Sequence, residues 1–221
     1  MLFRYRTIRH LSLRALVRMC SGLWRDYTFA NFIASPANAM SIVYAAKHFA
    51  AWRDPGYNPF FIFGAHGVGK THLMHAIGHT FHRRFPCWRL LLLTSADFAN
   101  RYCQARLRHR VMQFRRNLRR ADVLMTDDIQ YFIGKDRSMA EFIRLIKRFV
   151  RDKKPVVLVS HGRADDIEPF FRLLCDRYMH RGAVNEVVPP GRVMRVRIAK
   201  HLVNRNKFVV SAADIRRIAR S

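Results

Sequence analysis

The sequence predicts an α/β fold in which helices pack against a parallel β-sheet. Short apolar runs recur between polar breakers, stretches with helical periodicity lie between these runs, and a glycine-rich motif joins the first run to the helix after it. Apolar runs of this length are typical of buried parallel strands. Strands that alternate with helices favour a layered sheet.

Each expected element can be placed along the chain. Strands are expected at residues 60–63, 90–93, 123–125, 156–159 and 184–188. Helices are expected near residues 38–51, 70–83, 96–118, 138–152 and 165–179. Pro189-Pro190-Gly191 reads as a boundary, and two shorter helical stretches follow it at 192–205 and 211–220.

Charge and composition narrow the functional classes. The 221 residues include 41 Lys and Arg against 15 Asp and Glu, a formal net charge of +26. Such a charge favours a polyanionic partner, namely nucleic acid, nucleotide or an anionic membrane surface. An arginine-rich balance also arises from a GC-rich genome, so both explanations stay open. The chain lacks an apolar run near the roughly 20 residues that span a bilayer. Four cysteines without a CxxC pair suit a reducing cytosol, so we expect a cytoplasmic protein.

Residues 1–25 form a basic N-terminal arm with arginines and no acidic residue before Asp26. Leucine and valine between the arginines allow a basic amphipathic helix that contacts a membrane or nucleic acid. An organelle transit peptide and a poorly ordered arm remain alternatives.

The glycine-rich motif predicts a phosphate-binding loop. Residues 64–71 read Gly-Ala-His-Gly-Val-Gly-Lys-Thr and fit GxxxxGK[ST] between a strand and a helix, which is the context the motif requires. Glycines let the backbone N–H groups surround an anion at a helix N-terminus. Lys70 is expected to reach the β- and γ-phosphates, and the Thr71 hydroxyl to ligate Mg²⁺. The expected nucleotide contacts along this stretch are Gly64, Ala65, His66, Gly67, Val68, Gly69, Lys70, Thr71 and His72.

Acidic residues complete the expected site. Asp127 ends the apolar run 123–125 and is expected in the Mg²⁺ shell, while Asp128 is expected to orient or deprotonate an attacking water. The alternative is that one aspartate caps the following helix. His161 ends the next strand and is a candidate for sensing the γ-phosphate. These groups predict an ATP–Mg²⁺ site.

The stretch between Asp97 and Asp122 is basic. It has no acidic residue, carries arginines from Arg101 to Arg120, and includes Tyr102 and Phe114. A basic groove with stacking rings suits single-stranded nucleic acid, and a solvated charged helix face is the alternative.

Several strings resemble the bacterial chromosomal replication initiator ATPases, the DnaA family. They are Tyr27-Thr-Phe-x-Asn31-Phe32, residues 57–64, Gly67-Val-Gly-Lys-Thr-His-Leu-Met-His-Ala-Ile-Gly78, Asp122-Val-Leu-Met-Thr-Asp-Asp-Ile-Gln-Tyr-Phe132 and Gly134-Lys-Asp-Arg-Ser138. The matches run in order over about residues 26–190. The resemblance implies an AAA+ P-loop core with three αβα layers and a five-stranded parallel sheet. It also implies ATP-driven self-assembly on origin DNA, with the replicative helicase as a further partner.

The resemblance also implies roles for individual residues. The loop glycines with Lys70 and Thr71 match Walker A, and Asp127 with Asp128 match Walker B. Tyr27, Asn31 and Phe32 belong to the segment that holds adenine. Arg177 matches the arginine finger that acts across subunits, although by sequence alone it is one arginine among many. Lys135 and Arg137 match a loop that contacts single-stranded DNA, and Cys103 falls near another such contact.

The chain departs from the family pattern in two places. His161-Gly162 stand where the family usually has Asp-Arg after Ser160, which weakens the expectation of γ-phosphate sensing. The family continues into a helical lid with a sensor arginine and a duplex-reading helix-turn-helix domain, whereas residues 191–221 match only the start of a lid. We therefore expect the core of an initiator. The alternatives are a nucleotide-switched adaptor of the helicase-loader or initiator-regulator type, and a degenerate AAA+ protein that does not hydrolyse ATP.

Overall fold

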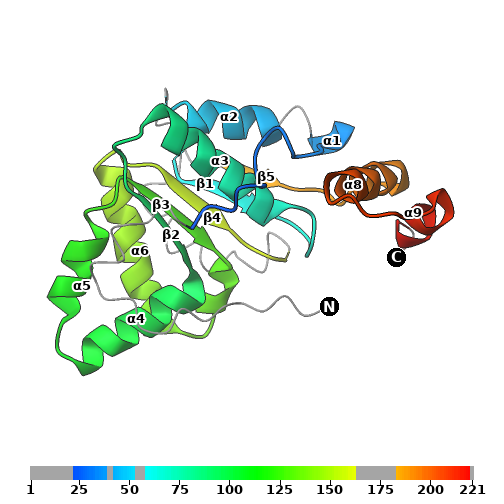
Figure 1. Ribbon diagram of the computed structural model, residues 1–221. Helices are drawn as coiled ribbons and strands as arrows, with labels where there is room; N and C mark the ends of the chain where they lie inside the picture. The colour runs from blue at the N-terminus through cyan, green and yellow to red at the C-terminus, as the bar shows by residue number, and fades with distance from the viewer. Residues whose placement is uncertain (1–21, 39–41, 53–57, 163–182, 220–221) are drawn as a thin grey trace.

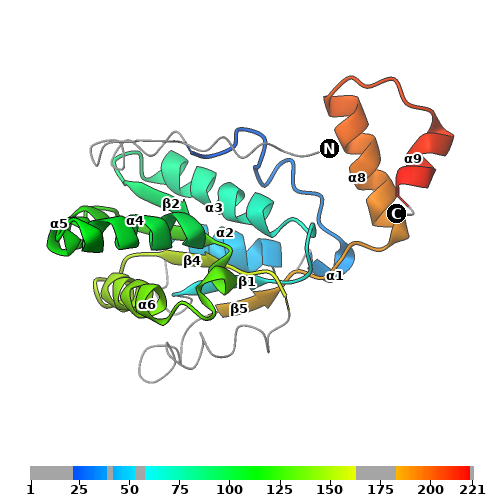
Figure 2. The same ribbon diagram turned by 90° about the horizontal axis from the view of Figure 1, so that it is seen from below.

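The protein folds as three layers, with a parallel sheet between two layers of helices (Figure 1, Figure 2). The computed structural model describes residues 22–38, 42–52, 58–162 and 183–219. The sheet has the order β2-β3-β4-β1-β5, and all its paired strands are parallel. The strands are β1 (Phe60–Phe63), β2 (Leu90–Thr94), β3 (Val123–Asp127), β4 (Val156–Val159) and β5 (Ala183–Glu186). The predicted α/β class and five-stranded parallel sheet are confirmed.

The helices follow the chain in the expected alternation with the strands. They are α1 (Pro36–Asn38), α2 (Tyr44–Ala50), α3 (Lys70–Arg84), α4 (Ser95–Leu107), α5 (Val111–Leu118), the 3₁₀ helix η4 (Ile129–Phe132), α6 (Asp136–Arg151), α8 (Arg192–Arg205) and α9 (Ala212–Ile218). The expected helix near 165–179 lies outside the described residues, as does most of the arm 1–25. Within the described ranges, none of the helices combines the length and the apolar character needed to cross a membrane.

The prediction of one helix over 96–118 is wrong, because the chain turns between α4 and α5. His109 adopts a left-handed conformation with φ 53°. Its N–H donates to the carbonyl of Arg106 at 3.0 Å, and the next N–H, of Arg110, reaches back to Ala105 at 2.7 Å. These two bonds form a Schellman motif, which ends a helix and usually contains glycine. The sequence has no glycine at this position, so it gives no signal that a helix ends there.

Alternate residues of each strand face opposite layers, as strand geometry requires. Phe61, Leu124 and Leu158 contribute to the core beneath α4, α5 and α6. Phe60, Ile62 and Val157 contribute to the core on the other face, which α2 and α3 cover (Figure 2). Burial on both faces explains why these strands read as continuous apolar runs and not as alternating patterns.

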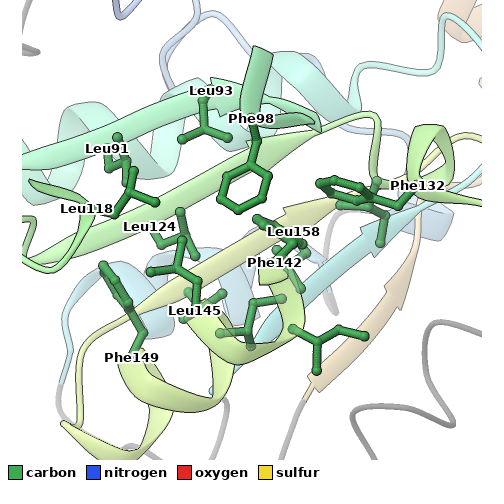
Figure 3. Packing of buried hydrophobic residues seen from close by; sticks show 14 of the residues in the cluster. Leu91, Leu93, Phe98, Leu118, Leu124, Phe132, Phe142, Leu145, Phe149 and Leu158 are labelled. Carbon is green, nitrogen blue, oxygen red and sulfur yellow. The ribbon is translucent and has the colours of Figure 1, made fainter. Parts of the chain in front are cut away.

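A phenylalanine cluster holds α4, η4 and α6 on the sheet (Figure 3). Phe98 of α4 makes edge-to-face contacts with Phe132 of η4 and Phe142 of α6, at ring-centroid distances of 5.8 and 5.0 Å. Phe132 and Phe142 stack at 4.6 Å. Such pairs add roughly 0.5–1.5 kcal/mol each to the burial of their area. The cluster therefore positions η4, which directly follows the acidic end of β3.

Replacement of Phe98 by alanine tests the importance of this cluster. The side chain is buried, with 1% of its area exposed, and its removal leaves a cavity. We expect Phe98→Ala to lower the free energy of unfolding by about 3–5 kcal/mol, measured by urea denaturation. Phe208→Ala is the matched control, because Phe208 is 64% exposed. An equally small change in both variants would contradict the assigned packing.

Candidate nucleotide-binding site

The glycine-rich loop connects the end of β1 to the first residue of α3. Gly64 has φ 144°, and a Cβ there would overlap the carbonyl oxygen of Val187, so the position excludes a side chain. Gly69, with φ 102°, immediately precedes Lys70, the first residue of α3. The loop therefore leads into the N-terminus of a fifteen-residue helix, where unpaired N–H groups and the helix dipole favour an anion.

Lys70 lies inside the loop. Its ammonium donates to the carbonyls of Gly64 at 2.9 Å and Ala65 at 2.6 Å. Burial lowers the pKa of Lys70, and the carboxylates of Asp127 and Asp128 partly offset this effect. The loop carbonyls thus hold the ammonium within the curve that the glycines form.

The Thr71 hydroxyl donates to Asp127 Oδ2 at 2.8 Å. Asp127 ends β3 and is buried, with 9% of its area exposed. Its other oxygen, Oδ1, accepts the N–H of Asp128 at 2.9 Å. Burial raises the pKa of Asp127, and the hydrogen bond from Thr71 opposes this rise. A hydroxyl and a carboxylate oxygen side by side are ligands that suit Mg²⁺, so these two residues fit the expected metal.

Asp128 is held in place by groups from β4 and η4. Its backbone is left-handed, with φ 59°, which aspartate tolerates better than most residues. Its Oδ1 lies 2.7 Å from Nε2 of His161 and accepts the side-chain N–H of Gln130 at 3.2 Å. His161 follows β4 as expected, so the three ends of β1, β3 and β4 meet at one edge. The His66 ring, from the loop, lies 4.9 Å from the His161 ring.

Gln130 is a site residue to which sequence reasoning assigned no role. Its Oε1 accepts hydrogen bonds from the Ser160 hydroxyl and from the His161 N–H, both at 3.1 Å. Its amide also contacts Asp128, so it links the end of β3 to the end of β4. The string that carries the family resemblance contains Gln130, but only the fold brings it to Ser160.

A row of histidines on α3 holds the N-terminal segment. His72, His75 and His79 lie on one helix face because they are three and four residues apart. Nε2 of His72 bonds the carbonyl of Thr28 at 2.9 Å. Nδ1 of His75 accepts the N–H of Trp24 at 3.2 Å, and Nε2 of His79 lies 2.9 Å from the Trp24 carbonyl. The segment predicted to hold adenine therefore lies against the helix that begins at the loop.

The three residues expected at the adenine lie around His72. The Tyr27 ring stacks on the His72 ring at 4.7 Å with an interplanar angle of 2°. Phe32 meets the same ring edge-on at 5.2 Å and approaches Gly69. Asn31 donates to the carbonyl of Asp26 at 2.9 Å and shapes the turn. Val68 and Phe32 are both partly buried against the core beneath α2 and α3.

Helix α8 reaches this segment from the C-terminal side. The guanidinium of Arg205 forms an ion pair with Asp26. Burial lowers the pKa of His72, the hydrogen bond to Thr28 opposes this change, and Arg205 and His201 lower the pKa further. Three parts of the chain, 24–32, α3 and α8, thus meet next to the loop.

The residues expected at nucleic acid lie on α4 and at the start of α6. Cys103 is exposed on α4, and Arg137 is exposed in the first turn of α6. The Lys135 ammonium lies 3.0 Å from the centroid of the Tyr131 ring and donates to the Tyr131 carbonyl at 3.1 Å. Arg177 lies outside the described residues. The expectation that Phe114 offers a stacking face is wrong, because Phe114 faces inward and packs on Phe98 with 5% of its area exposed.

The fold and the site at this edge define the class of AAA+ P-loop ATPases. The glycine loop follows β1, the acid pair lies at the end of β3, and β4 lies between these two strands in the sheet. A family model for the bacterial DnaA ATPase domain matches residues 23–184. The chain belongs to this family. The predicted family resemblance is confirmed.

The relatives agree in sequence and in structure. The chain is 36% identical over 176 residues to the chromosomal replication initiator protein DnaA of Thermus thermophilus. The aligned region covers 79% of this chain and 39% of the relative. It is 35% identical over 196 residues to DnaA of Deinococcus deserti, and this aligned region covers 88% of this chain and 42% of the relative. The chain therefore spans about two fifths of these relatives.

Solved structures show the same fold. Domain III of the Thermotoga maritima replication initiation protein DnaA superposes with a TM-score of 0.81 at 29% identity, over 89% of this chain and 81% of that one. DnaA from Aquifex aeolicus bound to AMPPCP superposes with a TM-score of 0.72 at 25% identity, over 88% and 59%. A replication initiator DnaA bound to AMPPCP and single-stranded DNA, at 24% identity and a TM-score of 0.74 over 90% and 60%, shares the fold.

The histidine row predicts that acid destabilises the fold. Burial lowers the pKa of His75 from 6.5 to about 4, with smaller contributions from His79 and His72. The unfolded chain therefore binds a proton more readily. The stability contributed by neutral His75 is complete above pH 6.5 and is lost as the pH falls toward 4, by up to about 1.4 kcal/mol per pH unit.

The control for this prediction is His75→Asn, which keeps an acceptor near Nδ1 but does not titrate. Urea denaturation of both proteins between about pH 7 and 4.5 should show a shallower loss of stability in the variant. Equal slopes for the two proteins would contradict the role of His75.

Proposed function

We propose that this chain is the ATP-binding and ATP-hydrolysing core of a chromosomal replication initiator that contacts single-stranded DNA at the origin. The single observation that carries the nucleotide part is the 2.8 Å contact between the Thr71 hydroxyl and Asp127, beside the glycine loop. In this proposal residues 26–190 are the nucleotide-binding core, residues 191–221 begin a helical lid, and the chain works in the cytoplasm.

Each group at the edge has a role in the proposal. The loop N–H groups and Lys70 bind the phosphates, with Gly64, Ala65, His66, Gly67, Val68 and Gly69 forming the curve. Tyr27, Asn31, Phe32 and His72 surround the base. Thr71 and Asp127 would hold Mg²⁺, which supplies charge neutralisation on the phosphates. Asp128 orients the attacking water and accepts its proton. Arg177 of one copy serves the site of the next in an ATP-dependent assembly.

Two variants separate binding from turnover. Lys70→Ala removes a charge-assisted contact worth about 1.5–3 kcal/mol, so we expect nucleotide affinity to fall about 10- to 100-fold. Asp128→Asn keeps the side-chain shape and removes the base, so affinity should stay within about twofold while turnover falls by about 10²–10⁴. Fluorescent ATP titration and phosphate release measure the two quantities.

Arg83→Ala is the control for both variants, because Arg83 is exposed in the last turn of α3, far along the helix from the loop. It lowers the net charge by one, as Lys70→Ala does, and should change neither quantity. Nucleotide affinity unchanged in Lys70→Ala would sink the proposed site.

A specific observation favours a second candidate, the nucleotide-switched adaptor. The carboxylate of Asp128 is already engaged by His161 and Gln130, which competes with the contact to a water. An adaptor binds ATP and releases no phosphate above the level of Asp128→Asn, so the same measurements distinguish the two candidates. Both candidate functions include a helicase as a partner.

Single-strand binding has its own test. Lys135 and Arg137 are exposed cations at the start of α6, and they contact phosphates in the proposal, which also includes Cys103, exposed on α4. Removing one phosphate contact should reduce the salt slope by about 0.7 on a single strand. Arg137→Ala should therefore weaken binding of several unrelated oligonucleotides equally, as measured by fluorescence anisotropy against salt. Unchanged affinity and slope would remove Arg137 from the interface.

A further inference from the structure

The surface between α5 and α6 contains a basic hollow of about 260 Å³. Six cationic side chains line it: Arg115 and Arg119 from α5 and its end, and Arg144, Lys147, Arg148 and Arg151 from α6. Helices α5 and α6 lie at the end of the molecule opposite to α8 and α9 (Figure 1, Figure 2). Because α8 lies next to the glycine loop, the hollow at the opposite end is separate from the nucleotide site.

A buried carboxylate organises two of these arginines. Glu141 is 5% exposed and accepts Nε and one terminal nitrogen of Arg115, both at 2.7 Å. It also accepts a terminal nitrogen of Arg144 at 2.7 Å. The two hydrogen bonds from Arg115 to Glu141 form a bidentate pair, which fixes the plane of the Arg115 guanidinium. Glu141 thus fixes two cations at the wall and has no oxygen left over for a second task.

The remaining cations outnumber the nearby acids. Arg148 pairs with Asp152 at 2.6 Å, and Arg151 lies 3.7 Å from the same carboxylate. Within the described part of the chain, the side chains of Arg119 and Lys147 make neither a hydrogen bond nor an ion pair. Arg119 lines the hollow from the C-terminal end of α5, and Lys147 lines it from α6. Their donors are available to an anion.

The floor of the hollow is apolar. Leu118 and Leu145 line it and belong to the core, at 4% and 7% exposure. A weakly polar floor strengthens the attraction between the surrounding cations and an anion. It also accepts an apolar sugar or base face, which a free strand exposes and a duplex keeps paired and stacked.

The arginines of α6 connect this hollow to the start of the helix. Arg137, Arg144, Arg148 and Arg151 are spaced by seven, four and three residues, so they lie along one face of α6. The rise over these fourteen residues is about 21 Å at 1.5 Å per residue. At the stacked spacing of about 3.4 Å per nucleotide, this length matches at most roughly six nucleotides of one strand.

We propose that the hollow between α5 and α6 is a phosphate-binding subsite for single-stranded nucleic acid, with Arg119 and Lys147 as its free cationic contacts. A strand lying along the arginine face of α6 would place its backbone phosphates in the hollow. This subsite is additional to the proposed contacts of Lys135 and Arg137 and does not need nucleotide.

The test is a charge-matched pair of double variants. Arg119→Gln with Lys147→Gln removes the two cations of the hollow that make no ion pair. Arg83→Gln with Arg216→Gln removes two exposed cations on α3 and α9. The probe is a 5′-labelled oligothymidylate of about 20 nucleotides, longer than the roughly six that α6 spans. It is titrated by anisotropy over a salt series without nucleotide or magnesium. Thermal unfolding verifies that each variant is folded.

We expect the hollow variant to bind the single strand about tenfold more weakly at low salt, with a slope shallower by about 1.4 for two lost phosphate contacts. The control should differ from wild type by less than about twofold. A duplex of equal length should lose less than the single strand does. Equal losses in both double variants would mean that affinity follows net charge, and equal losses for duplex would mean that the site is not specific for single strands; either result overturns the proposal.

Arg137→Ala separates this inference from the proposed function. Weaker binding by the hollow variant together with normal binding by Arg137→Ala supports the subsite and contradicts the proposed loop contact. The reverse pattern overturns the subsite and leaves the loop contact standing.

Discussion

The hydrogen bond from Thr71 to Asp127 joins two segments 56 residues apart, and the site depends on it. β4 makes the contact possible, because it pairs with β1 on one side and β3 on the other. The registers place Phe60 beside Val157 and Leu124 beside Val156. The carboxyl ends of β1 and β3 therefore reach the same edge, one strand apart, as parallel topology requires. The loop and the acid pair are brought together by apolar pairing in the middle of the sheet.

The polar groups at that edge of the sheet form hydrogen bonds with one another. Asp127 accepts from Thr71 and from the backbone of Asp128, while Gln130 bridges Asp128 to Ser160 and His161. Buried polar groups are costly unless paired. The network thus keeps both aspartates oriented, and the aromatic cluster of Phe98, Phe132 and Phe142 holds η4 and with it Gln130 in place.

The N-terminal segment and α8 approach α3 from opposite ends of the chain. His72 and His75 bond the backbone of Thr28 and Trp24, and Arg205 pairs with Asp26. The Asp26–Arg205 ion pair therefore connects the proposed adenine segment directly to α8.

The sequence by itself determined the class of fold, the strands, most helices and the loop with its acid pair, because apolar runs and a glycine motif are local signals. It failed where local signals were absent: His109 ends α4 without a glycine, and the inward position of Phe114 depends on the packing of α5 against Phe98 of α4. Only the tertiary structure decided that Gln130 meets Ser160, that Arg205 meets Asp26, and that Glu141 of α6 binds Arg115 of α5. These pairs are distant in sequence or lie on separate elements, so their energies depend on the register and burial that the completed sheet imposes.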